Sequence, residues 1–219
     1  MKKFIYENGL SLTLLAITLL TLGGNLLTGW YEFNNELEEY GRQAVGFGAY
    51  LTSGHCIEAV FENWESEFLQ MGLYVWLTVF LRQKGSSESK DLEEKEKVDR
   101  KPSASRRGAP WPVKCGGWVL WLYKNSLSLA LFVLFGLTFF LHAAGGVKQY
   151  NLQQELKGKA ERLSMGEFMG TSEFWFQSFQ NWQSEFLSIL AIVVLSIFLR
   201  QQGSPQSKPV DASNEETGT

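Results

Sequence analysis

The chain has 219 residues, 20 of them lysine or arginine and 23 aspartate or glutamate, with a formal net charge of -3. Its apolar residues gather into four runs and are not spread at the spacing of a soluble core, which predicts a membrane protein. Basic and acidic residues are interleaved, and neither GxGxxG nor GxxxxGK[ST] occurs. We therefore expect no nucleic acid and no nucleotide among its partners.

The first apolar run extends from Leu10 to Leu27 and looks at first like a signal peptide. The same pattern recurs inside the chain, because YENGLSLTLL from Tyr6 matches YKNSLSLALF from Tyr123. An internal copy is not a cleaved leader, so we expect a retained membrane anchor. The matching third run is expected to span the membrane over Leu127 to Ala144.

The second apolar run is also repeated. Residues 61–90 read FENWESEFLQMGLYVWLTVFLRQKGSSESK, and residues 179–208 read FQNWQSEFLSILAIVVLSIFLRQQGSPQSK, identical at 17 of 30 positions. Each copy has an aromatic, amide-rich entry, a glutamate, an apolar run and an arginine at its end. Two matched pairs of runs predict that the chain is a duplicated pair of membrane-spanning hairpins.

These patterns predict an all-α polytopic membrane protein with four transmembrane helices, arranged as two parallel helical-hairpin repeats. The bilayer is the expected partner, and a homo-oligomer stays open. The expected segments are 1–82 as the first two-span repeat, 83–117 as a charged cytoplasmic linker, 118–203 as the second repeat and 204–219 as a disordered tail.

The basic residues predict the orientation. Ten lysines and arginines lie in 82–114, against one in 30–62 and four in 148–183. By the positive-inside rule, both termini and the linker are expected in the cytoplasm. Cys56 and Cys115 then lie on opposite sides and are not expected to pair. With two histidines in the chain and no CxxC motif, no metal site and no cofactor are expected.

The polar residues of the runs are predicted to share one depth and one face. Glu67 lies about 22 Å along the helix from Arg82, Glu185 repeats this spacing, and Asn25 and His142 fall at a similar height. An ionisable side chain facing lipid costs several kcal/mol, so these stripes should face each other or water. The predicted interior stripe also contains Asn63, Gln70, Thr78, Asn181, Ser188 and Ser196.

Two functional interpretations follow. In the first, the chain is a structural or accessory membrane protein whose polar residues hydrogen-bond its helices together. In the alternative, it is a small transporter or channel in which Glu67 and Glu185, with His142 and Asn25, form a proton or cation site. A lipid or peptide ligand is a further alternative. No catalytic residue is assigned, and we do not expect an enzyme.

The stretches GHCIEAVFENWESEF, NWESEFLQMG and LRQKGSSESKD add a resemblance. With them the chain resembles a family of uncharacterised bacterial integral membrane proteins that carry a domain of unknown function. The resemblance covers nearly the whole chain apart from the linker and the tail. It implies a location in the bacterial inner membrane, and it implies no activity, substrate or catalytic residue.

Overall fold

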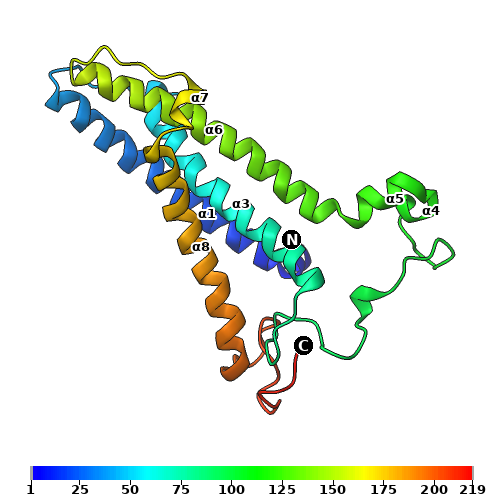
Figure 1. The fold of residues 1–219 in the computed structure, drawn as a ribbon. Coiled ribbons are helices and arrows are strands. Elements are labelled where there is room, and N and C mark those ends of the chain that lie inside the picture. The colour runs from blue at the N-terminus through cyan, green and yellow to red at the C-terminus, as the bar shows by residue number, and fades with distance from the viewer. Residues whose placement is uncertain (1, 219) are drawn as a thin grey trace. The chain divides into compact units, whose positions relative to one another are not determined.

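The structure is a computed structural model that describes residues 2–218, and over this range it is helical and contains no strand. This confirms the all-α prediction. The elements, which Figure 1 shows in chain order, are α1 (Lys2–Glu39), α2 (Phe47–Tyr50), α3 (Gly54–Phe80), the 3-10 helix η1 (Lys97–Asp99), α4 (Trp111–Cys115), α5 (Gly117–Lys124), α6 (Ser126–Leu156), α7 (Met165–Phe168) and α8 (Ser172–Phe198).

Three of the described helices are long and apolar enough to cross a membrane, namely α1 from Lys3, α6 and α8. They are consistent with a membrane location. The fourth expected span corresponds to α3, which has 27 residues, as α8 has. However, α3 contains four glutamates where α8 contains two, and it is not among the three apolar helices. The predicted count of four spans is therefore not confirmed.

The two longest helices end in the same way. Gly41 after α1 and Gly158 after α6 have φ angles of 70° and 71°. Their amides donate to the carbonyls of Glu38 at 2.9 Å and Glu155 at 3.0 Å. A positive φ favours glycine because it has no Cβ, so each glycine stops its helix. The chain then turns into a helix of four residues, α2 after α1 and α7 after α6.

The chain divides into two compact units, which are described separately. Unit 1 contains the chain up to Glu62 together with Phe139–Trp175, and unit 2 contains Asn63–Thr138 and the chain from Phe176 onwards. The unit boundaries fall within α3, α6 and α8. They therefore differ from the sequence division into 1–82, 83–117, 118–203 and 204–219, which stays a prediction.

Unit 1 is built around two apolar clusters. One consists of Phe33, Leu37, Tyr50 and Cys56, and the other of Ala143, Phe168 and Phe174. A Cβ on Gly54 of α3 would collide with the backbone of α6, lying 2.8 Å from the carbonyl oxygen of Gly145. The two backbones touch at this point because both residues are glycines, a packing device common between membrane helices.

Unit 2 contains the linker and the C-terminal tail. The disorder expected for 204–219 stays a prediction, and residues 204–218 follow a series of turns. Their main-chain bonds include those from Ser207 to Ser204 at 3.3 Å and from Ala212 to Pro209 at 3.1 Å. The tail therefore has a defined course in the structure up to Gly218.

Candidate functional site

The turn after α1, from Gly41 to Cys56, is fixed by one asparagine, and we call it the first corner. The side-chain amide of Asn34 donates to the carbonyl of Val45 at 3.1 Å, and the amide of Val45 donates back to Asn34 Oδ1 at 2.8 Å. The indole of Trp30 donates to the same carbonyl at 2.8 Å. Asn34 and Trp30, both in α1, thus hold the loop that leads into α2.

The turn after α6, from Gly158 to Phe174, is fixed in the same way, and we call it the second corner. Asn151 donates to the carbonyl of Leu163 at 2.9 Å, and the amide of Leu163 donates to Asn151 Oδ1 at 2.8 Å. Asn151 aligns with Asn34 in the sequence match between the halves. Both asparagines therefore satisfy a backbone amide and a backbone carbonyl of the following loop.

Each corner also seats one fully buried ring against a glycine. In the first, Tyr50 lies against Gly29 and 5.8 Å from the ring of Phe33. In the second, Phe168 lies against Gly146 and 5.9 Å from the ring of Tyr150. Burial, reinforced by neighbouring Cys56, raises the pKa of Tyr50 to about 12. The Tyr50 hydroxyl is therefore neutral at physiological pH.

The next helix starts alike in both corners. The Ser53 hydroxyl accepts the amide of Cys56 at 3.1 Å before α3, and the Thr171 hydroxyl accepts the amide of Phe174 at 3.3 Å before α8. A hydroxyl at the start of a helix satisfies an amide that has no intrahelical partner. The corners thus share three features. The clasp is the pair of bonds from Asn34 or Asn151 to the following loop, and the ring seat is the buried ring of Tyr50 or Phe168 packed against a glycine. The cap is the hydroxyl that accepts an amide at the start of the next helix.

Two of the predicted site residues, His142 and Asn25, lie in unit 1. His142 is fully buried, and its ring stacks on Phe174 at a centroid distance of 4.8 Å and an interplanar angle of 26°. It is part of the aromatic packing of the second corner. Asn25 is exposed on α1. The two predicted glutamates belong to unit 2.

Glu67 lies on α3 and Glu185 on α8, both within unit 2. Glu67 is exposed in the chain itself and Glu185 is half-buried. The fully buried glutamate of α3 is instead Glu65. Its Oε1 accepts hydrogen bonds from the hydroxyl of Ser178 at 2.9 Å and the indole of Trp182 at 3.3 Å. Glu65 therefore ties α3 to α8.

The predicted polar stripe divides into groups with different partners. Gln70 joins α3 to α8, donating to the carbonyl of Glu185 at 2.8 Å and to the hydroxyl of Ser188 at 3.0 Å. Ser196 exchanges a 2.9 Å hydrogen bond with Ser86 of the loop after α3. Thr78 donates to the carbonyls of Tyr74 and Val75 within α3, and Asn181 donates to the carbonyl of Gln177 within α8. Asn63 is exposed on α3.

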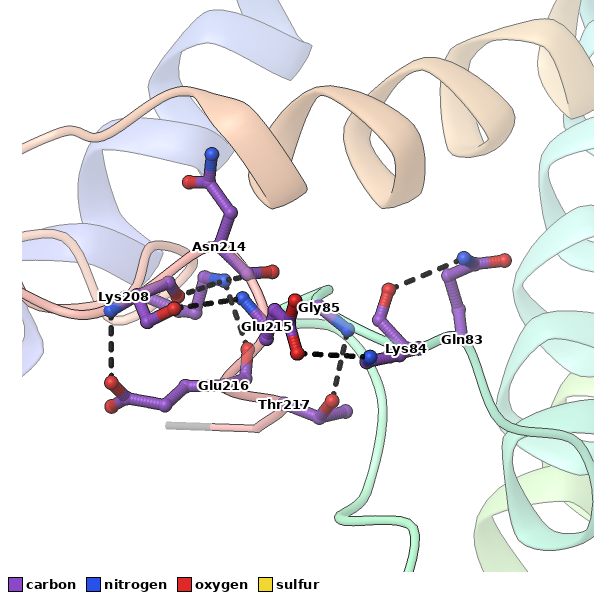
Figure 2. Close-up of polar contacts among 9 residues, drawn as sticks. Gln83, Lys84, Gly85, Lys208, Asn214, Glu215, Glu216 and Thr217 are labelled. Carbon is purple, nitrogen blue, oxygen red and sulfur yellow. Dashed lines mark hydrogen bonds and ion pairs between the residues drawn. The ribbon is translucent and has the colours of Figure 1, made fainter.

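The C-terminal tail supplies a polar cluster that the sequence argument missed. The ammonium of Lys208, which is 2 % exposed, donates to the carbonyls of Ser213 at 3.0 Å and Glu216 at 2.9 Å. Burial and then the charge of Arg200 lower the pKa of Lys208. Figure 2 shows Asn214 to Thr217 beside the loop after α3, where the amide of Gly85 donates to Thr217 at 2.9 Å.

The arrangement of these polar groups limits what they can do. Glu65, Gln70, Asn34 and Asn151 each accept from or donate to named groups of the chain. Within residues 2–218, no group of three or more histidine, cysteine, aspartate or glutamate side chains is placed to hold a metal ion. The strongest geometric feature is therefore a set of polar ties within each unit.

A family model described as "Domain of unknown function (DUF6766)" matches residues 1–219. No curated protein and no solved structure matches the chain.

Proposed function

Since the chain belongs to the DUF6766 family, whose description carries no activity, we propose its function from the polar ties. We propose that it is a non-enzymatic, structural or accessory protein of the bacterial inner membrane. The observation that carries this is Glu65, the fully buried carboxyl whose partners come from α8. A buried carboxyl that accepts hydrogen bonds from a hydroxyl and an indole N–H of another helix connects the two helices.

The proposal includes four spans in two repeated hairpins, with α3 as the fourth. Two observations support it. α3 and α8 have equal lengths, and the corners after α1 and α6 carry the same clasp, ring seat and cap. In α3, Glu65 and Gln70 are hydrogen-bonded to groups of α8, and these bonds lower the free-energy cost of placing the two polar side chains in the bilayer.

The proposed orientation places both termini in the cytoplasm, and the structure improves its test. Cys56 is 4 % exposed, so a labelling reagent would miss it on either side. A Gln43→Cys substitution puts a thiol on an exposed position of the first corner, while Cys115 is exposed already. A membrane-impermeant maleimide added to intact spheroplasts should label the new cysteine at position 43 and spare Cys115. The reverse pattern would overturn the orientation.

The structural role is tested by two substitutions of one residue in purified protein. Glu65→Gln keeps an acceptor for Ser178 and Trp182 and should retain most of the stability, whereas Glu65→Leu leaves a buried hydroxyl and indole unsatisfied. We expect Glu65→Leu to lose about 2 kcal/mol, measured by unfolding in mixed micelles. The companion measurement is proton flux into liposomes. A flux that Glu67→Gln/Glu185→Gln abolishes would refute a purely structural role.

A further inference from the structure

The charge of the chain between α3 and α6 is divided into two parts. Residues 83–99 contain four lysines and six acidic residues, a net charge of -2. Residues 100–124 contain six lysines and arginines and no acidic residue, a net charge of +6. We call the second part the basic segment. It ends directly before α6, one of the three helices that are apolar enough to cross a membrane.

The basic segment includes the helices α4 and α5, neither of which has a buried residue. Its three tryptophans are largely open, with exposed fractions of 69 % at Trp111, 73 % at Trp118 and 58 % at Trp121. Tryptophan has an apolar body and a polar N–H, and it collects where a membrane meets water. Open tryptophans in a segment rich in lysine and arginine match both the apolar-to-polar character and the negative charge of the headgroup layer.

A break of one residue separates α5 from α6, so the tryptophans of α5 lie close in the chain to the start of α6. α5 ends at Lys124 and α6 begins at Ser126, with Asn125 between them at φ -111° and ψ 5°. The side chain of Asn125 donates to the carbonyl of Trp121 at 2.7 Å. Asn8, its sequence match, donates to the carbonyl of Phe4 at 2.9 Å, yet lies inside the unbroken α1. The helix is thus interrupted at Asn125 but not at the matching Asn8.

We propose that the basic segment binds the surface of an anionic lipid bilayer. The tryptophans of α4 and α5 lie at headgroup depth, and the six cations face the lipid phosphates. Charged and aromatic residues contribute together to such binding, and each lysine or arginine near an anionic surface strengthens it about five-fold. The proposal is independent of the role of Glu65 and needs only that α6 crosses the membrane.

Cys115 is the last residue of α4 and serves as a native reporter. In a Cys56→Ser variant it is the single cysteine, and a nitroxide attached to it reports depth by its collisions with oxygen, which dissolves in lipid, and with a nickel chelate, which stays in water. We expect a lipid-facing label in vesicles of phosphatidylcholine with phosphatidylglycerol. In pure phosphatidylcholine the label should move toward water. Glu94→Cys in a Cys56→Ser/Cys115→Ser background places the label in the mixed-charge part and provides a water-exposed comparison.

Two matched charge variants decide whether the cations act locally. Arg106→Gln/Arg107→Gln and Lys95→Gln/Lys97→Gln each remove two charges at exposed positions. Only the first should shift the label toward water in anionic vesicles, by a several-fold change in the ratio of the two collision rates. Equal effects of both pairs, equal depth in neutral and anionic vesicles, or a water-exposed label throughout would each overturn the proposal. Circular dichroism confirms that every variant remains helical.

Discussion

The two corners of unit 1 have the same clasp but different chemistry around it. In the first corner, the carbonyl of Val45 accepts two bonds, one from Asn34 and one from Trp30, and the α2 N-cap is Gly46 without a side-chain cap. In the second, the carbonyl of Leu163 is bonded by Asn151, and the α7 N-cap is a serine in a capping box. The clasp is thus the shared requirement, and each corner adds its own second support.

The largest effect is predicted for a substitution that disrupts the ring seat of the second corner. A Cβ on Gly146 would overlap the ring of Phe168, lying 2.8 Å from its Cζ, and would approach a carboxylate oxygen of Glu58 to 3.3 Å. Gly146→Ala should therefore cost about 3 kcal/mol, the upper end for overpacking. Gly29→Ala should cost less, because the side chain of Tyr50 meets it by its hydroxyl end. Chemical denaturation in micelles measures both.

The control for the ring seats is Gly24→Ala in α1, where an added Cβ has no neighbour within 4 Å. It should be neutral or stabilise by up to about 1 kcal/mol, because alanine favours helix. If all three alanines were equally tolerated, the ring seats would not hold the corners.

The second prediction is that removing the asparagine of each clasp has a different cost in the two corners. Asn151→Ala removes both bonds to Leu163 and leaves its amide and carbonyl without this partner, at a cost of about 2 kcal/mol. Asn34→Ala should cost about 1 kcal/mol less, because Trp30 still bonds the carbonyl of Val45. The measurement is the denaturation midpoint of each variant. Adding Trp30→Phe to Asn34→Ala should remove the difference, and an unchanged midpoint in the double variant would contradict this account.

The third prediction concerns the cap of α7. The Glu167 carboxylate accepts the amide and hydroxyl of Ser164, and these bonds lower the pKa of Glu167 below its ordinary value of 4.5. A lowered folded-state pKa adds stability at higher pH that is lost as the pH falls through it. Ser164→Ala removes the N-cap hydroxyl and one of these bonds, so it should destabilise the protein near neutral pH. Below the lowered pKa, the difference from wild type should narrow.

The corresponding gain is expected in the first corner. Gly46→Ser with Ala49→Glu places the same two side chains at the N-cap and N3 positions of α2. Thermal unfolding should then occur at a slightly higher temperature. A loss of stability would show that Gly46 is needed for a reason other than the missing cap.

The smallest prediction concerns alkaline pH. Folding raises the pKa of Tyr50 from 10.0 to about 12 because its hydroxyl is buried. A raised pKa favours the neutral form in the folded state, so its contribution to stability is lost as the pH rises from 10.0 toward about 12. Tyr50→Phe makes the first corner resemble the second and should remove this contribution. The stability difference between wild type and variant, followed over that range, tests it.

Sequence reasoning gave the all-α class and the apolar helices, because long apolar runs leave few alternatives. It selected Glu67 because Glu185 matches it, but the fully buried glutamate is Glu65, whose match is Gln183. Residues two apart lie about 200° apart around a helix, so the two glutamates of α3 face different directions. Identity between copies does not report which face is buried.

The corners were missed for another reason. The sequence match pairs Asn34 with Asn151, but both lie beyond the apolar runs, where a polar side chain is unremarkable. The clasp depends on the turn that a positive φ at Gly41 or Gly158 begins. Such a tertiary contact between a helix residue and the following loop leaves no periodic signal in the sequence.

The loops inside the two clasps differ in length by one residue. Between the helix-ending bond of Arg42 and the clasped Val45 there are two residues, and between the equivalent Lys159 and Leu163 there are three. The same pair of asparagine bonds is thus made across loops of two and of three residues. This is consequently the place in each corner where an epitope tag or a fluorescent-protein graft would be accommodated with least harm to the folded molecule.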